Sequence, residues 1–418
     1  MKAQNPGCGG HDDPSQTLDE ALERIRAGIV PLEGFETVAT RAALDRILHE
    51  PIRSTVNVPA HTNSAMDGYA LAGAQLPAEG ERAFKVVGTA WAGRPYHGAT
   101  GDGECVRIMT GAPVPPATDT VVMQERVRRE GDQAIIGSGH RHGQNVRPAG
   151  EDLKAGDVAL EPGQRLRPAH LGLIASLGVS EVRVKRRPRV AFFSTGDELA
   201  SIGEPLGDGQ IYDSNRYTLY GMLRRLDVDI IDLGVVRDRR EDLEQAFHVA
   251  AAQADVIITS GGVSVGEADF VTETIERLGE VDFWTVAIKP GRPIAFGQVG
   301  GAWFFGLPGN PVSAMVTFYQ LVQPALRQLM GLAAPEVPIY VRAVCDSRIK
   351  KKPGRREFQR GTLSRDADGR YRVSTTGHQG SGVLRSMAIA NCLIVLPEDA
   401  GTVEAGGEVD VQPFSSIC

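Results

Sequence analysis

The sequence predicts a multidomain protein of the α/β plus β class, with a central α/β domain that has a mostly parallel sheet. Three observations support this prediction. A chain of 418 residues is long enough for about two to four domains. Strand and helix patterns alternate over residues 188–332, whereas residues 56–150 and 335–418 contain short apolar runs between turns. The 49 glycines and 25 prolines fit many turns, and hence much β structure.

Composition and charge exclude several classes of function. Apolar residues make up 42% of the chain and charged residues 23%, which is ordinary for a globular protein. The formal charge is -7, which argues against nucleic acid as a main partner. The five cysteines are widely spaced without a CxxC pair, as expected in a reducing cytoplasm. Because we find no apolar run of the roughly 18 residues that span a bilayer, we expect a cytoplasmic protein without a membrane partner.

The N-terminal part predicts two helices, a β insert and a third helix. Thr17 and Glu20 form a T-x-x-E capping box, so we expect a helix directly after Thr17. A second short helix is predicted over about 40–48 from its apolar spacing. Residues 56–150 lack any helix-length periodic run and predict a small all-β insert. Residues 170–178 return to a helical pattern, with a glycine at the expected C-cap.

The α/β domain begins with a buried apolar strand at 190–195 and ends with a helix after Asn310, which has Pro311 at its first position. Between them, strands and helices alternate in the order expected for right-handed crossovers. Ligands of such a sheet bind at the carboxyl ends of its strands. Residues 335–418 then predict a small β-barrel or sandwich.

The segment TSGGVSVGEADF, at 259–270, is the clearest candidate for a ligand-binding loop. Gly261 and Gly262 permit close backbone approach, and the following helix start offers free N–H groups to a phosphate or another tetrahedral oxyanion. Asp269 and an acidic neighbour suit a divalent cation that bridges to the phosphate. A local role is the alternative, since Ser264 and the glutamate three residues later match a capping box.

The same segment contains a G-x-S-x-G pattern, so a serine hydrolase is an alternative function. Chain order could supply Ser264, Asp346 and His378 as a triad. The sequence lacks the HGGG-type segment that forms an oxyanion hole in such enzymes. The acidic residues close to Ser264 would also repel a developing oxyanion, which disfavours this alternative.

Three further segments contain charged candidates. FSTGDEL, at 193–199, places Glu198 at the end of a strand, although a plain turn also explains the pattern. Lys289 lies in AIKPGRP, whose rigid turns can preorganise backbone donors for an anion. Seven of the fourteen residues at 347–360 are Lys or Arg. This run is either a solvated loop, in which its lysines are free surface charges, or a segment that recruits anions, with Arg360 best placed.

Taken together, the motifs resemble the molybdopterin molybdenumtransferase family, the bacterial MoeA proteins related to the E domain of gephyrin. The motifs that carry the resemblance are, in chain order, NSAMDGYA, RIMTGAPVP, GEDL, FSTGDEL, GDGQIYDSN, TSGGVSVGEADF, KPGRP, GLPGNPVSA, FQRG and TTGHQGS. The resemblance covers about 17–414. It implies that the chain inserts molybdate into the dithiolene of adenylyl-molybdopterin and releases AMP, with Mg2+ as cofactor.

The resemblance also implies an architecture and partners. The expected domains are a discontinuous linking domain (17–55 and 151–187), a β lid domain (56–150), an α/β molybdopterin-binding domain (188–332) and a C-terminal β-barrel domain (333–418). The family forms homodimers with the active site in a cleft at the dimer interface. A molybdopterin adenylyltransferase and apo-molybdoenzymes are the expected transient partners.

Individual residues receive roles from the same resemblance. Catalytic roles are implied for Asp152, Glu198, Asp238, Asp269 and Lys289. Asp269 and Glu198 are also the implied metal ligands. Substrate-binding roles are implied for Ser260, Gly261, Gly262, Ser264, Pro290, Arg360 and Ser381. Among all of these, Lys289, Arg360 and Ser381 are the expected contacts of molybdate.

Two positions depart from the family pattern. Thr62 replaces the first aspartate of DNSAMDGYA, and Thr285 stands where relatives often carry lysine. Both replacements remove a charged side chain from the expected cleft. A non-catalytic dimeric scaffold of the same fold therefore remains an alternative to the enzyme.

Overall fold

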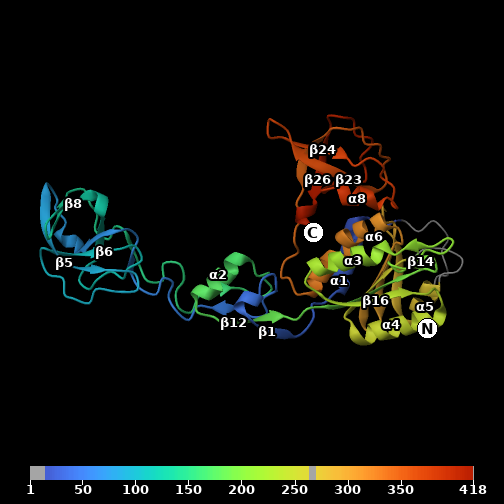
Figure 1. The fold of residues 1–418 in the computed structure, drawn as a ribbon, viewed down its shortest axis with the longest axis horizontal. Helices are drawn as coiled ribbons and strands as arrows, with labels where there is room; N and C mark the ends of the chain where they lie inside the picture. Colours follow the sequence, from blue (N-terminus) through green and yellow to red (C-terminus); the bar gives the residue numbers. More distant parts are fainter. Residues whose placement is uncertain (1–14, 263–269, 418) are drawn as a thin grey trace, which may run out of the picture. The chain divides into compact units, whose positions relative to one another are not determined.

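The computed structural model describes residues 15–262 and 270–417, and the chain divides into two compact units. The first unit comprises Met1–Glu36, Asp45–Ile47 and Lys185–Cys418, and the second comprises Thr37–Leu44 and Leu48–Val184. Figure 1 labels the elements along the chain. Each unit has its own hydrophobic cores, so each is described by itself.

The first unit contains the predicted α/β sheet. Its six strands are β16 (Asp229–Val236), β13 (Arg189–Thr195), β17 (Val256–Ser260), β21 (Ala302–Leu307), β20 (Pro293–Val299) and β18 (Gly279–Thr285), in that spatial order. The first four run parallel, and β20 then pairs antiparallel with both β21 and β18. This arrangement confirms the α/β prediction, with a mixed edge.

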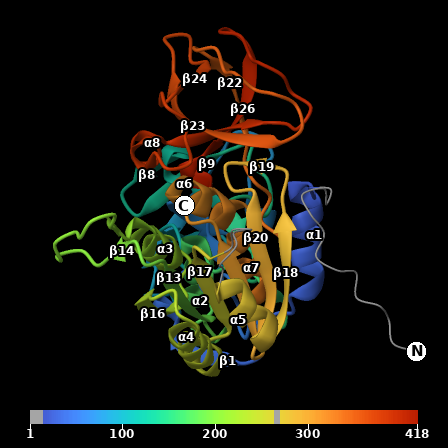
Figure 2. The same cartoon turned by 90° about the vertical axis from the view of Figure 1, so that its right-hand side faces the viewer.

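Helices cover both faces of this sheet (Figure 2). One face packs on α1 (Leu18–Gly28), α3 (Ser214–Arg225), α6 (Pro311–Thr317), η4 (Phe318–Val322) and α7 (Gln323–Leu329), and the other packs on α4 (Arg240–Gln253) and α5 (Phe270–Leu278). The capping box of α1 forms as predicted. The Thr17 hydroxyl accepts a hydrogen bond from the Glu20 N–H at 3.2 Å, and the Glu20 carboxylate accepts one from the Thr17 N–H at 2.8 Å.

The C-terminal part of the first unit is a closed β-barrel. Its strands are β22 (Val341–Cys345), β23 (Arg356–Arg365), β24 (Tyr371–Thr375), β25 (Cys392–Leu396) and β26 (Glu408–Pro413), with β19 (Ile288–Lys289) added beside β23. Pairing of β23 with β25 closes the ring. The barrel and the short helix α8 (Leu384–Ile389) share a core with the α/β sheet, because Phe358 and Leu393 pack in the same cluster as Phe305 and Leu307. The pocket described below is therefore built on one packed body.

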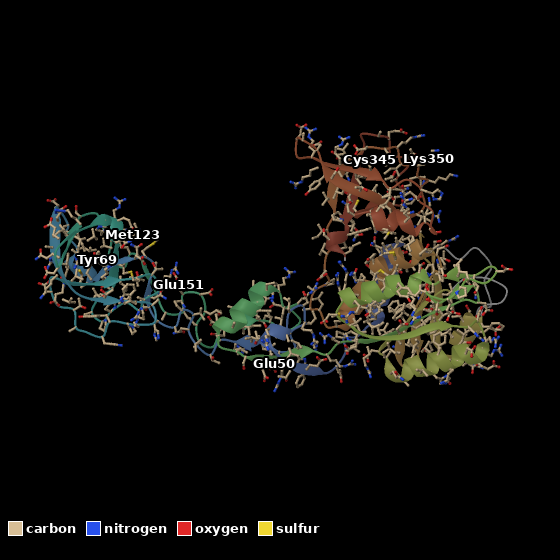
Figure 3. The ribbon with its side chains drawn as sticks, viewed as in Figure 1. Glu50, Tyr69, Met123, Glu151, Cys345 and Lys350 are labelled. Atoms are coloured by element: carbon tan, nitrogen blue, oxygen red, sulfur yellow. The ribbon has the colours of Figure 1, made fainter. Side chains whose placement is uncertain are left out.

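The second unit contains the predicted β insert. Its six-stranded sheet has the spatial order β7 (Thr120–Met123), β4 (Gly68–Leu71), β6 (Glu104–Ile108), β5 (Glu81–Ala90), β9 (Gln133–Gly137) and β8 (Val127–Glu130). Tyr69 and Met123 lie on this sheet (Figure 3). A separate core surrounds α2 (Pro168–Ser176).

Short strand pairs complete the two units. These are β1 (Phe35–Ala39) with β12 (Glu181–Lys185), β2 (Ile52–Arg53) with β11 (Val158–Leu160), β3 (Asn63–Ser64) with β10 (Val146–Arg147), and β14 (Leu199–Ala200) with β15 (Ile211–Tyr212).

The helix predicted over about 40–48 is wrong. Only a single 3-10 turn forms, at Thr40–Ala42. Asp45 adopts a left-handed backbone conformation (φ 63°), which cannot continue a right-handed helix. The Leu48 N–H then donates to the Gln164 carbonyl instead of to a helical partner. Of the apolar residues in this irregular segment, Ala43, Ile47 and Leu48 are buried and Leu44 is exposed, so their helical spacing does not produce one buried helix face.

Candidate functional site

A cavity of about 820 Å³ lies at the carboxyl ends of β13 and β17, where ligands of an α/β sheet are expected. The starts of α3 and α6 form another part of its wall, and Gly382 and Leu384 of the barrel region complete it. Of the residues predicted from the sequence, this cavity brings together Glu198, Asp238, Ser260, Gly261 and Gly262. All of these residues belong to the first unit.

Gly261 and Gly262 form a turn at the end of β17 that no other residue could adopt without strain. Both have positive φ, of 95° and 68°. A Cβ on Gly261 would lie 2.7 Å from the Thr195 carbonyl oxygen, and one on Gly262 would lie 2.4 Å from a methyl group of Val271. The glycine pair therefore exposes backbone to the cavity, as predicted for a loop that approaches an anion.

Acidic side chains line one side of the cavity. Glu198 folds back over Gly196, where an added Cβ would meet the Glu198 carboxylate at 2.5 Å. Asp213, at the N-cap of α3, accepts a hydrogen bond from the Arg216 N–H at 3.1 Å through Oδ1. Its buried Oδ2 accepts no hydrogen bond from the described residues. Asp238 is half-buried, and its N–H donates to Asp197 at 3.4 Å. This side of the cavity is rich in carboxylate oxygens.

These carboxylates fit Mg2+ held jointly with a substrate. Within residues 15–262 and 270–417, no three His, Cys, Asp or Glu side chains lie together as a metal site. Mg2+ usually needs fewer protein ligands, because one or two carboxylates combine with substrate phosphates and water. Glu198, Asp213 and Asp238 provide oxygen ligands of the right kind, and the unpaired Oδ2 of Asp213 is an available one. Asp269 and Ser264, which the sequence also proposes, lie outside the described residues.

Asn215 is a cavity residue to which sequence analysis assigned no role. It lies in the first turn of α3 and is only 8% exposed. Its Nδ2 donates to the Ser260 hydroxyl and to the Gly309 carbonyl, both at 2.7 Å. The motif GDGQIYDSN contained this residue, but spacing alone does not show that it contacts the end of β17 and the loop before α6.

Lys289, Pro290 and Ser381 do not line this cavity. The Lys289 ammonium, half-exposed, pairs with the buried carboxylate of Glu357 at 3.1 Å. Pro290 is buried beside it. The Ser381 carbonyl accepts a hydrogen bond from the Val312 N–H at 3.0 Å, so the barrel loop that contains Ser381 is attached to the start of α6.

Arg360 is buried, with 1% of its surface exposed. Its Nε donates to the Ser386 hydroxyl at 2.9 Å, and its Nη2 donates to the Gly380 carbonyl at 3.0 Å. Burial lowers the pKa of the guanidinium to about 10. At neutral pH Arg360 therefore remains a cation, held by neutral partners next to the loop of Ser381.

The basic run at 347–360 is not uniformly solvated. Lys350, labelled on the barrel in Figure 3, and Lys352 are exposed. Lys351 between them is only 5% exposed and donates to the carbonyls of Ala400 at 2.9 Å and Glu398 at 3.2 Å. The sequence interpretation of free surface lysines is therefore wrong for Lys351, because its side chain closes a turn of the barrel.

Asp152 belongs to the second unit and is exposed. Its N–H donates to the Val58 carbonyl at 3.0 Å. Thr62, in the same unit, accepts a hydrogen bond from the Ala149 N–H at 3.2 Å through its hydroxyl. Thr62, which replaces an aspartate of the family pattern, thus makes a local structural contact.

Two members of the alternative serine triad, Asp346 and His378, make other contacts. Asp346 accepts hydrogen bonds from Arg372 and from the Ser374 hydroxyl, the latter at 3.0 Å. His378 Nδ1 accepts one from the Gly380 N–H at 3.2 Å. Because the carboxylate is paired with an arginine, it does not orient the imidazole as a hydrolase requires.

Three family models match consecutive parts of the chain. Residues 16–178 match the MoeA N-terminal region (domain I and II), residues 191–328 match a probable molybdopterin binding domain, and residues 342–414 match the MoeA C-terminal region (domain IV). Among the described residues, we find no helix with the length and apolar content to cross a membrane.

Whole-length relatives agree with these matches. A molybdopterin molybdenumtransferase of Haemophilus influenzae is 45% identical over 96% of this chain and 99% of its own. One of Nostoc sp. is 36% identical over 90% of this chain and 87% of its own. The crystal structure of the molybdopterin biosynthesis moeA protein from Pyrococcus horikoshii OT3 is 29% identical, covers 96% of this chain and 100% of its own, and has a TM-score of 0.83.

Proposed function

The chain belongs to the molybdopterin molybdenumtransferase (MoeA) family, transferases of molybdenum cofactor biosynthesis, and we propose that it inserts molybdate into adenylyl-molybdopterin with release of AMP. The observation that carries this proposal is the cavity at the carboxyl ends of β13 and β17. Its glycine turn exposes backbone, and the starts of α3 and α6 face it with the positive ends of their dipoles. Such a cavity suits the phosphates of an adenylylated substrate.

Mg2+ is the proposed cofactor, held by Glu198 with Asp238, Asp213 or Asp269. When bound, it would neutralise charge on the substrate phosphates. The carboxylates on the cavity wall support this assignment, since they would repel a phosphate in the absence of a cation. Removal of Mg2+ by a chelator should therefore abolish AMP release, and added Mg2+ should restore it.

Molybdate is the proposed second substrate, with Arg360, Lys289 and Ser381 as its contacts. Arg360 supports this assignment because it is a desolvated cation whose present partners are neutral. A tetrahedral dianion would gain a charge-assisted hydrogen bond from such a group. Pro290, beside Lys289, would shape the same region.

The direct test is release of AMP from adenylyl-molybdopterin by the purified protein, measured with and without molybdate. We expect molybdate-dependent release by the wild type and a severe loss in Glu198→Gln, with unchanged folding by circular dichroism. Complementation of a strain that lacks molybdenum insertion tests the same proposal in cells. Failure of both, with a folded protein, would favour the non-catalytic scaffold, which Thr62 and Thr285 suggest.

The proposed assembly is a homodimer, and the proposed transient partners are a molybdopterin adenylyltransferase and apo-molybdoenzymes. The first would supply the adenylylated substrate, and the second would accept the finished cofactor. The family membership supports this order, because the substrate must be adenylylated before AMP can be released.

A further inference from the structure

The side chain of Asn215 connects two turns on the cavity wall. Its Nδ2 lies 2.7 Å from the Ser260 Oγ, at the end of β17, and 2.7 Å from the Gly309 carbonyl, in the loop before α6. Asn215 and Ser260 are both buried, with 8% and 2% of their surfaces exposed, and both line the cavity. The Asn215 amide therefore links two turns that are far apart in the sequence, at Ser260 and Gly309, and that both line the cavity.

The chemistry of the three groups fixes the direction of each hydrogen bond. A carbonyl oxygen only accepts, so the atom of the Asn215 amide that faces Gly309 must be the NH2 group. The same NH2 group has a second hydrogen, which points to Ser260 Oγ, so this hydroxyl accepts from Asn215. The proton of the Ser260 hydroxyl is then free to be donated elsewhere. Within residues 15–262 and 270–417, this hydroxyl donates no hydrogen bond.

A purely structural role does not explain the whole arrangement. The Oδ1 atom of Asn215 is buried and accepts no hydrogen bond from the described residues. Leaving a buried acceptor unsatisfied destabilises the fold, so such groups are few and usually have another reason. The adjacent Asp213, the N-cap of the same helix, also has a buried carboxylate oxygen without a partner in the described part of the chain. Two unsatisfied groups at one wall point to a ligand.

We propose that Asn215 is a positioning residue that holds Ser260 as a hydrogen-bond donor to a phosphate oxygen of the bound substrate. The proposal rests on the function proposed above and identifies one determinant of its preference for a phosphate-bearing substrate. By accepting from Asn215, Ser260 presents its proton beside the glycine turn, where the backbone also approaches the anion. The contact acts in binding and not in the chemical step.

The proposal predicts a coupled effect on substrate binding. Ser260→Ala should raise the KM for adenylyl-molybdopterin about tenfold or more, since a hydrogen bond to a charged group is typically worth that much. Asn215→Ala should raise the same KM similarly, because the Ser260 hydroxyl then loses the hydrogen bond that orients its proton toward the substrate. The double variant should be no worse than Ser260→Ala alone. The KM for molybdate should not change.

Asn215→Asp tests the direction of the Ser260 hydrogen bond more specifically. Its carboxylate keeps the size of the amide but accepts the Ser260 proton, so the hydroxyl can no longer donate to the substrate. We expect weaker substrate binding than in Asn215→Ala. Thr218→Val is the matched control, because Thr218 lies one turn further along α3 and its hydroxyl donates to the Asn215 carbonyl at 3.0 Å. This control should show the wild-type KM.

Equilibrium binding of ADP, which carries the adenylyl and diphosphate groups, separates the proposal from the proposed function. Should the wild type release no AMP but bind ADP, with the same coupled losses in the variants, the function would be wrong and the role of Asn215 would stand. Independent, additive effects of the two alanine variants would overturn the role of Asn215. So would a wild-type ADP affinity in Asn215→Ala with only a lowered thermal midpoint, or no binding of ADP to the wild type.

Discussion

Single residues of the basic run at 347–360 have different roles, as Arg360 and Lys351 illustrate. Both are buried, yet Arg360 contacts a serine hydroxyl and a loop carbonyl next to Ser381, whereas Lys351 closes a barrel turn through carbonyls. The sequence alone predicted the cationic character of the run. It singled out Arg360 but not the burial of Lys351, because that burial depends on contacts with a turn that lies far away in the sequence.

Replacement of Arg360 should weaken the use of molybdate. A charge-assisted hydrogen bond in a desolvated site contributes about 1.5–3 kcal/mol, so Arg360→Ala should raise the molybdate requirement roughly ten- to a hundredfold. Lys289→Ala should show a smaller effect, since that side chain is half-exposed. Arg365→Ala on the same strand, where the arginine bonds to Tyr371, is the control. Arg360→Lys keeps the charge and should recover part of the loss; unchanged molybdate dependence in both Arg360 variants would exclude this contact.

Replacement of Lys351 should lower stability and leave the chemistry intact. Lys351→Ala removes a buried donor from the Ala400 carbonyl, whereas the Glu398 carbonyl keeps the Gly354 N–H, and loss of such a donor costs about 1–3 kcal/mol. Lys350→Ala and Lys352→Ala are matched controls on either side, and as exposed residues they should stay within about 0.5 kcal/mol of the wild type. Urea unfolding measures the free energy of unfolding of all three variants. Equal stability of the three variants would contradict the structural role.

At the scale of elements, the sequence predicted those parts whose pattern is local. The capping box placed the start of α1, and the alternation of strands and helices predicted the sheet with ligands at its carboxyl edge. The failed helix at 40–48 shows the limit, since the Leu48 N–H bonds to a residue more than a hundred positions away. Asn215 was missed for the same reason, because its contacts with Ser260 and Gly309 depend on tertiary packing. The domain boundaries drawn from the sequence stay predictions.

Asp255, just before β17, should make the stability of the sheet depend on pH. Burial would raise the pKa of this carboxyl, but hydrogen bonds from Arg186 and Arg189 outweigh burial and hold the pKa well below its usual 3.8. A lowered pKa in the folded state means that the stabilisation is present above about pH 4 and is lost as the pH falls toward the folded-state pKa.

Asp255→Asn should therefore destabilise the protein by about 2–3 kcal/mol at pH 7. This is at or below the lower limit of the range of about 3–5 kcal/mol for a buried pair, because both arginines are partly exposed. The difference from the wild type should shrink below pH 4. Asp282→Asn breaks an exposed pair with Arg24 and should cost less than about 1 kcal/mol. Chemical unfolding between pH 3 and 7 tests both variants, and a pH-independent difference for Asp255→Asn would refute the linkage.

At the scale of the whole molecule, exposed apolar side chains bear on how the protein assembles. Several large apolar side chains of the first unit are exposed, among them Val337 at 83%, Ile339 at 61% and Ile202 at 58%. Exposed apolar groups of this size favour association when they gather on one surface. We expect a homodimer, as the family resemblance implies, with twice the chain mass of 44.8 kDa by light scattering. A species of 44.8 kDa alone, across micromolar concentrations, would be evidence against the dimer.

The core that the barrel shares with the α/β sheet also limits how this protein can change over evolutionary time. Phe358 and Leu393 of the barrel pack in the same cluster as Phe305 and Leu307 of the sheet. Neither part therefore has a hydrophobic core that is complete without the other. Exchange of the barrel for an unrelated one, or its loss by truncation, would expose apolar side chains of this shared cluster. The two parts are consequently inherited together, and recombination between distant relatives should be tolerated outside this junction and penalised within it.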